Sequence, residues 1–365
     1  MKRIKLLTVM AALLCSVMAF AQNINFADPK VKEICVAHWD TNHDGELSYE
    51  EAAAVHFLAE AFRNQTEITS FDEFQYFTGI TSIYVDLDVE VYPPYDFDDG
   101  SNHESGFFGC SNLKSIVLPN SVVSISGTLI PDLEFNPMGL SLENVGFQVE
   151  EPFMYSNIYS PFTGCNCLEH IQLPNSVKTI GGAAFYKFGG TIDIPNSITN
   201  IGVFAFYESG LVSINLSSDI KTIGASAFAK SKLKSIEIPN SINTIEEATF
   251  YDCSNLTSIS IPASVSSIGE RAFAGCSSLN SITIPNGVKQ LGKVYDWSYK
   301  FWYSNKDYVE DFPRQQNGVL GIKKVGPWRQ LSNFMGLFEG CSSLTNIDIP
   351  NTVTIIGDRC FNRCI

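Results

Sequence analysis

Basic residues are scarce in this chain of 365 residues, and their scarcity excludes one class of partner. The chain has 24 Lys and Arg against 39 Asp and Glu, which gives a formal net charge of −15 at pH 7. Proteins that bind nucleic acid need clusters of Lys and Arg to neutralise the phosphates. We therefore expect no nucleic-acid partner, and a surface charge that favours solubility and cation binding.

Catalytic motifs are missing from the sequence as well. It contains no nucleophile elbow, Walker loop, dinucleotide fingerprint or zinc-hydrolase spacing. Only five His residues are present to serve in acid–base chemistry or metal binding. A pair of carboxylates for glycoside hydrolysis would meet only in space, so the sequence leaves that alternative open. On these grounds we predict that the protein is not an enzyme.

Long apolar runs are limited to one segment at the start of the chain. Residues 4–17 are mostly apolar, follow Lys2 and Arg3, and precede the small residues Ala19 and Ala21. This order is typical of a secretory signal peptide, and the run is shorter than the roughly 20 residues that cross a bilayer. We predict that the first 21 residues are a signal peptide and that the protein is secreted or displayed at the cell surface.

A repeat of 21–23 residues dominates the rest of the chain. Residues 256–262 and 279–285 share the frame L-x-x-I-x-I-P, and segments resembling N-x-V-x-x-I-G and A-F-x-x-C follow it. Apolar and polar residues alternate in the first segment, which predicts a short half-buried strand, and its proline ends the strand. The frame recurs from Leu113, Leu168, Gly189, Leu211, Leu233 and Leu344.

The repeat predicts a solenoid. One unit cannot bury its own apolar edge, but stacked units can, with strands about 4.8 Å apart in a parallel ladder. We therefore predict a β-rich, right-handed coil in which Ile236, Ile259 and Ile282 lie on neighbouring rungs.

The predicted solenoid covers residues 77–365. A degenerate first coil places Ile80, Ile83 and Val85 at the apolar phases of the L-x-x-I-x-I-P frame. The spacing of the repeats is interrupted twice, and loops of this kind on a regular scaffold are often functional. The insertions fall at about residues 126–161 and 293–337.

The complete frame, L-x-x-I-x-I-P-N-x-V-x-x-I-G-x-x-A-F-x-x-C, resembles the BspA-like leucine-rich-repeat family of bacterial surface proteins. The resemblance covers roughly residues 77–365 and implies a leucine-rich-repeat solenoid. It also implies an exported protein that binds host or matrix proteins, or other cells. It implies no single ligand, because a scaffold does not determine a function.

The cysteines occupy one phase of the repeat. Six of them lie three residues after the repeat Phe, and in intermediate coils this phase holds Phe188, Ser209 and Ser231. A position that accepts Cys, Ser or Phe is an interior site where Cys acts as a small apolar residue, so we favour buried free thiols. Bridges between adjacent coils are the alternative. The six are Cys110, Cys165, Cys253, Cys276, Cys341 and Cys364.

Residues 40–51 have the spacing of a calcium loop. Side-chain oxygens occupy positions one, three, five, nine and twelve, position seven offers its carbonyl, and Gly45 stands where the loop must turn. The flanking apolar spacing is helical, so residues 22–76 are expected to form an EF-hand-like pair, similar to half a dockerin repeat, that caps the first coil. The alternative is an acidic loop in which Ser48 and Glu51 merely cap the second helix. The predicted calcium ligands are Asp40, Asn42, Asp44, Glu46, Ser48 and Glu51.

Two surfaces are candidates for ligand binding. One is the second insertion, which holds three of the four Trp residues, and exposed aromatics anchor protein partners or stack on sugars. The same aromatics could instead pack against the flank of the solenoid. The other is the polar outward face of the strands, including Ser258 and Ser281, which could equally be only solvated. The aromatic candidates are Trp297, Tyr299, Trp302, Tyr303 and Trp328.

We therefore expect a binding or adhesion scaffold with a host or matrix protein as its ligand and one structural calcium ion. The alternative is a carbohydrate-binding or cell-envelope component that uses the tryptophan-rich insertion.

Overall fold

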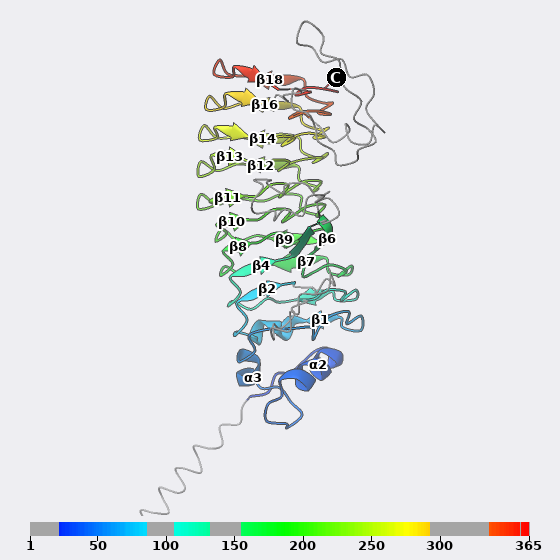
Figure 1. The fold of residues 1–365 in the computed structure, drawn as a ribbon. Coiled ribbons are helices and arrows are strands. Elements are labelled where there is room, and N and C mark those ends of the chain that lie inside the picture. The colour runs from blue at the N-terminus through cyan, green and yellow to red at the C-terminus, as the bar shows by residue number, and fades with distance from the viewer. Residues whose placement is uncertain (1–21, 86–105, 132–154, 293–335, 358, 365) are drawn as a thin grey trace, which may run out of the picture.

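The structure, a computed structural model, describes residues 22–85, 106–131, 155–292, 336–357 and 359–364. Within them, short strands are stacked along one axis, and two helices lie at the N-terminal end of the stack (Figure 1). The predicted signal peptide lies outside the described residues, as does most of both insertions. In the part of the chain that is described, no helix is long and apolar enough to span a membrane.

The first ladder is built by the L-x-x-I-x-I-P segments, and we call it the strand ladder. Ile236 pairs with Ile259 in parallel register, and a backbone hydrogen bond of 3.5 Å joins the segment of Ile259 to that of Ile282. The predicted parallel rungs are thus confirmed. The strands are β1 (Ser70–Phe71), β3 (Ser115–Ile116), β7 (His170–Gln172), β9 (Thr191–Asp193), β12 (Ser235–Glu237), β14 (Ser258–Ser260), β16 (Ser281–Thr283) and β18 (Asn346–Asp348).

A second parallel ladder, the return ladder, is built by the N-x-V-x-x-I-G segments. Its first five strands form one sheet in the order β11-β10-β8-β4-β2, and the remaining strands form two pairs. The strands are β2 (Ser82–Tyr84), β4 (Ser124–Ser126), β8 (Thr179–Ile180), β10 (Asn200–Ile201), β11 (Thr222–Ile223), β13 (Thr244–Ile245), β15 (Ser267–Ile268), β17 (Gln290–Leu291) and β19 (Ile355–Ile356).

The start of the solenoid differs from the sequence-based prediction. Ile83 pairs with Ile125 of the return ladder, so the assignment of Ile80, Ile83 and Val85 to the L-x-x-I-x-I-P phase is wrong. The two ladders share the spacing of two apolar residues three positions apart, which makes an isolated segment ambiguous. The first rung of the strand ladder is instead β1, where Phe71 pairs with Ile116. The ladder therefore begins before the expected boundary at residue 77.

Both insertions leave the ladders in register. The first begins and ends in an antiparallel hairpin between β5 (Thr128–Pro131) and β6 (Tyr155–Tyr159). Across the second, Ile282 of β16 pairs directly with Ile347 of β18. The coils before and after each insertion are therefore neighbours in space.

A column of Phe side chains from the A-F-x-x-C segments runs through the core. Each ring stacks on the next with centroids 5.5–6.0 Å apart and planes within 11° of parallel. Eight of the nine rings are almost completely buried, and Phe361 of the last coil is partly buried. The spacing is that of successive coils, so the column links every coil from Phe107 onward. The rings are Phe107, Phe162, Phe185, Phe206, Phe228, Phe250, Phe273, Phe338 and Phe361.

The cysteine phase lies beside this column. The Cys276 thiol donates to the Phe250 carbonyl of the preceding coil at 3.1 Å, and the other five cysteines of this phase make the equivalent hydrogen bond. All nine cysteines among the described residues are free, as the free-thiol interpretation predicts. The phase is thus an interior site, and where it holds Cys the thiol is hydrogen-bonded to the preceding coil. Where Gly189 replaces the following Leu, Phe188 occupies the phase.

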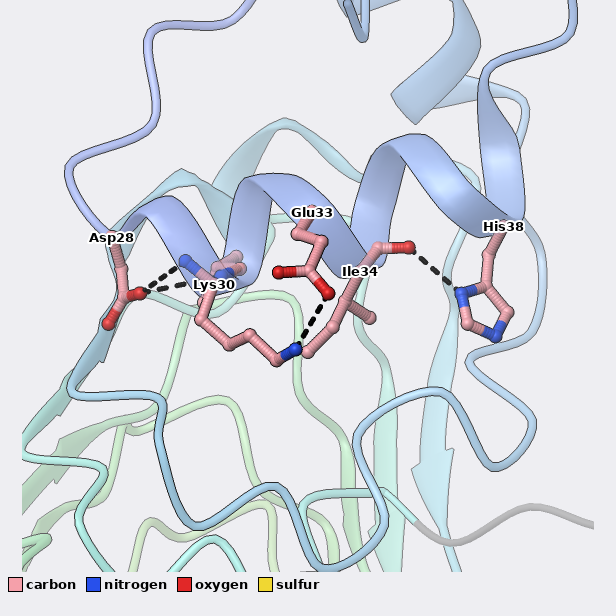
Figure 2. Close-up of polar contacts among 6 residues, drawn as sticks. Asp28, Lys30, Glu33, Ile34 and His38 are labelled. Atoms are coloured by element: carbon pink, nitrogen blue, oxygen red, sulfur yellow. Dashed lines mark hydrogen bonds and ion pairs between the residues drawn. The ribbon is translucent and has the colours of Figure 1, made fainter. Parts of the chain in front are cut away.

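The N-terminal segment contains α2 (Pro29–Trp39), α3 (Tyr49–Ala53) and the 3-10 helix η1 (Asp72–Tyr76). Asp28 caps α2, because its Oδ1 accepts hydrogen bonds from Lys30 N at 2.9 Å and Val31 N at 3.4 Å (Figure 2). Its Oδ2 accepts from Thr69 N at 2.7 Å and Thr69 Oγ1 at 2.8 Å, next to β1. One carboxylate therefore ties the helix to the first rung. With helices of only 11 and 5 residues, the EF-hand-like pair stays a prediction.

Candidate functional site

The strand ladder presents a flat polar face, which we call the strand face. Along each three-residue strand the central Ile faces the core, and the residues on either side are exposed. The face therefore offers hydroxyl, amide and carboxylate groups at the regular spacing of the rungs. Its exposed residues on the three-residue strands are His170, Gln172, Thr191, Asp193, Ser235, Glu237, Ser258, Ser260, Ser281, Thr283, Asn346 and Asp348.

His170 is a residue of this face that the sequence analysis did not single out. Its Nδ1 lies 2.9 Å from Thr191 Oγ1, and its Nε2 lies 3.3 Å from Asp193 Oδ2. A hydroxyl, an imidazole and a carboxylate in series also occur in nucleophilic enzymes. Here the three side chains are exposed, and Thr191 Oγ1 donates to the Glu169 carbonyl at 3.2 Å. The arrangement joins β7 to β9. The position of His170 at an outward-facing place in the L-x-x-I-x-I-P frame is the sequence signal that could have identified this residue.

The predicted calcium loop is folded by hydrogen bonds from its own backbone. Asp40 accepts from His43 N at 2.7 Å and from Gly45 N at 2.9 Å. Asn42 Oδ1 accepts from Asp44 N at 2.8 Å, and Asp44 Oδ1 accepts from Glu46 N at 2.9 Å. Gly45 has a φ of 83°, which glycine adopts without strain. Residues at positions one, three, five and six thus hold the chain in a tight turn.

Glu51, at position twelve, lies against both ends of the loop. Its Oε1 accepts from Thr41 N at 2.9 Å and Thr41 Oγ1 at 2.8 Å. Its Oε2 accepts from Ser48 N and Ser48 Oγ, both at 2.9 Å. Partial burial alone would raise the pKa of Glu51, but the hydrogen bonds from Ser48 and Thr41 outweigh it and lower the pKa to about 2.

Ser48 and Glu51 also form the capping box of α3, because Ser48 Oγ accepts from Glu51 N at 3.2 Å. The helix-capping role considered from the sequence is therefore present. The side chain of Glu46 forms an ion pair with Lys32 Nζ at 2.6 Å. The group of Glu46 predicted to bind the metal is its backbone carbonyl, which this ion pair leaves unused. Among the described residues, no three His, Cys, Asp or Glu side chains are grouped closely enough to hold a metal ion.

The tryptophan-rich candidates fall outside the described residues. This applies to Trp297, Tyr299, Trp302, Tyr303 and Trp328. The strand face and the loop of residues 40–51 are therefore the two predicted sites that the structure describes.

The sequence matches the model of the BspA type leucine rich repeat region in six copies, over residues 101–189, 189–299 and 334–365. These matches cover more than half of the chain. No functionally curated protein is detectably similar to it.

Several solved structures are similar to the chain. A leucine-rich repeat protein of T. pallidum is 24% identical over 55% of this chain and 72% of its own, with a TM-score of 0.36. A leucine-rich repeat protein from Bacteroides ovatus is 22% identical over 82% of this chain and 81% of its own, with a TM-score of 0.24. The pneumococcal vaccine antigen PcpA is 20% identical over 59% of this chain and 51% of its own, with a TM-score of 0.33.

Proposed function

Because the chain belongs to the family of proteins with BspA-type leucine-rich repeats, we propose that it is an exported binding or adhesion scaffold. Its ligand is a host or extracellular-matrix protein, and its contact surface is the strand face. The observation that carries the proposal is the rigid ladder of exposed polar side chains at fixed spacing. Such a surface is preorganised, so binding need not order it at an entropic cost.

The strand face supports a polar mode of recognition. It carries Ser and Thr hydroxyls together with the carboxylates of Asp193, Glu237 and Asp348. On the three-residue strands that the structure describes, none of the exposed strand-face residues is Phe, Tyr or Trp. Hydrogen bonds and charge complementarity must therefore supply the specificity of binding. A partner with exposed Lys or Arg side chains fits this face best.

The experiment compares binding to purified matrix proteins by the wild type and by a double variant, Ser258→Arg/Ser281→Arg. The two substitutions place bulky positive charges at the centre of the strand face, where we expect at least a tenfold loss of affinity. The matched control, Ser266→Arg/Ser267→Arg, makes the same chemical change on the return ladder and should bind as the wild type does. Equal loss in both variants, or no binding by the wild type, would contradict the proposal.

We also propose that the loop of residues 40–51 binds one calcium ion. Support comes from the fit of the donor set: hard oxygens stand at the loop positions that calcium requires, on a backbone that is already turned. A side-chain oxygen that accepts one hydrogen bond keeps a second lone pair for a cation. Glu51 is the residue whose hydrogen bonds compete with the ion. Bound calcium would stabilise the N-terminal segment against the first coil.

Calcium binding is tested by thermal unfolding with calcium and with a chelator. A ligand at about one hundred times its Kd stabilises the folded state by about 2.7 kcal/mol, so the wild type should melt at a higher temperature in calcium. Asp40→Ala should abolish this increase. Glu50 is an exposed residue of the loop that is not among the predicted ligands, so Glu50→Gln should retain the increase in melting temperature. An unchanged melting temperature in the wild type would refute the site.

A carbohydrate ligand at the second insertion is the alternative function. Three of the four Trp residues of the chain lie between residues 293 and 337, and sugars stack on such rings. Glycan arrays separate the two functions: loss of a glycan signal in Trp297→Ala and Trp302→Ala would support the alternative. The absence of any glycan signal from the wild type would count against it.

A further inference from the structure

The outward side of the return ladder differs in chemistry from the rest of this acidic protein. We call it the return face and define it as the two residues that follow the first Val or Ile of each return segment, from Thr81 and Ser82 to Thr354 and Ile355. These 18 positions hold ten Ser or Thr, three Asn or Gln, three Lys and two apolar residues. Among the described residues of this face, none is Asp or Glu. The return face is therefore locally cationic.

The three positive charges are Lys178, Lys221 and Lys289, and all are exposed. The hydroxyl side chains are expected at these positions, because Thr is favoured in strands. Lys is not favoured in strands, so the three lysines need another explanation. Lys178 and Lys221 are two coils apart, and Lys289 follows three coils later. At about 4.8 Å per rung these separations are about 10 Å and about 14 Å. The lysines thus form a row along the solenoid axis.

A depression lies at the middle lysine. In this coil Ser217 and Ser218 replace the Pro-Asn pair that ends most strands of the repeat, and residues 211–217 form no strand. The space has a volume of about 550 Å³ and opens to solvent. Its lining residues are Thr199, Ser218, Asp219, Ile220, Lys221 and Ser241.

The chemistry of the depression selects a class of ligand. The ammonium group of Lys221 donates to an anionic group, while the hydroxyls of Ser218 and Ser241 exchange hydrogen bonds with neutral hydroxyls. Asp219 only accepts hydrogen bonds, so it suits a ligand that carries hydroxyl donors and disfavours a densely charged chain such as a nucleic acid. Other carboxylates follow the return strands β13 and β15 in the chain, at Glu246, Glu247 and Glu270, and lie outside the positions that define the return face.

We infer that the return face binds a linear polysaccharide bearing carboxylate groups, with one saccharide unit seated in the depression beside Lys221. Sugar hydroxyls pair with Asp219 and the Ser and Thr side chains, and successive carboxylates pair with the row of lysines. The flat ladder matches an extended polymer, because both repeat along one axis. This surface is separate from the strand face, so the inference does not depend on the proposed protein ligand.

The test measures binding of an oligogalacturonate of defined length by calorimetry at low ionic strength. A calcium chelator is present throughout, because calcium would cross-link the probe. Lys178→Gln/Lys221→Gln/Lys289→Gln should lower the affinity at least tenfold, which corresponds to about 1.4 kcal/mol. The matched control removes the same charge from exposed lysines outside the face and should keep its affinity within about twofold, since distant exposed charges are screened. The control variant is Lys114→Gln/Lys232→Gln/Lys234→Gln.

Two further probes identify what is recognised. A neutral maltooligosaccharide of equal length should bind at least tenfold more weakly, because it offers nothing to the lysines. Polyglutamate should also bind more weakly than the oligogalacturonate, because it lacks hydroxyls for Asp219. In Asp219→Asn the affinities for the two probes should be closer to each other. Equal binding of polyglutamate, equal loss in the control variant, or no binding of the oligogalacturonate would each overturn the inference. The strand-face variant Ser258→Arg/Ser281→Arg should bind the oligogalacturonate normally, so the two proposals fail separately.

Discussion

Replacing Phe228 with Ala should produce a large and local loss of stability. Phe228 is fully buried, and it stacks on Phe206 at 5.6 Å with planes 2° apart and on Phe250 at 5.6 Å with planes 7° apart. Removing a buried Phe side chain costs about 3–5 kcal/mol, because apolar contacts are lost and a cavity remains. Each lost aromatic pair adds about 0.5–1.5 kcal/mol. Because Phe228 takes part in two such pairs, we expect the free energy of unfolding to fall by about 4–8 kcal/mol.

The loss should stay near the substitution, because each coil of a solenoid contacts only its neighbours. Urea unfolding followed by circular dichroism measures the magnitude, and hydrogen exchange with mass spectrometry measures the location. Backbone amides in residues 206–250 should exchange faster, while those in residues 107–125 should keep their protection. Phe228→Leu removes fewer atoms, so it should show a smaller loss with the same location.

Phe57→Ala is the matched control, because the Phe57 side chain is 52% exposed. Its unfolding free energy should change by less than about 0.5 kcal/mol. A loss below about 1.5 kcal/mol in Phe228→Ala, or an equal loss of protection in residues 107–125, would refute the assignment of the column as the structural link between coils.

Three other outcomes follow from contacts described above. Asp28→Ala removes the cap of α2 and the hydrogen bonds to Thr69, so limited proteolysis should cut the N-terminal segment faster, with a loss of about 2–4 kcal/mol in local stability. The fold lowers the pKa of Glu51 to about 2 from 4.5. Its stabilising effect is complete above the unfolded-state pKa and is lost as the pH falls through the folded-state pKa. The melting temperature of the wild type should therefore drop between these two pKa values more steeply than that of Glu51→Gln; parallel curves would contradict this. Burial raises the pKa of the Cys276 thiol well above its usual value. A thiol reagent at neutral pH should therefore label the half-buried Cys167 and Cys364 first and the buried thiols only after unfolding; rapid labelling of every thiol would contradict the interior column.

The strand register could be predicted from the sequence because the repeat is regular. Once Leu256 and Leu279 are aligned, alternation places Ile259 and Ile282 in the core, and a parallel ladder is the arrangement that covers both. The interior position of the cysteine phase could be predicted for the same reason, since Ser209 occupies this phase in another coil. Each conclusion came from comparing units, which a single segment does not permit.

Features outside the repeat could not be predicted in the same way. The phase of Ile83 was wrong because both ladders use the same apolar spacing. The hydrogen bonds between Asp28 and Thr69 join residues 41 positions apart, and no pattern in the sequence predicts them. The spacing of the calcium loop is visible in the sequence, but the preference of Glu51 for Ser48 and Thr41 depends on the turn that the loop adopts.

The direct pairing of β16 with β18 has a consequence for how this protein can change. Ser281 and Asn346 are register partners although a long stretch of chain separates them. The coil that ends before that stretch and the coil that begins after it therefore stack directly on each other, and the register of the ladder is kept. Such a junction is permissive, so foreign segments could be grafted there, or lengthened and shortened over generations, while the scaffold keeps its dimensions.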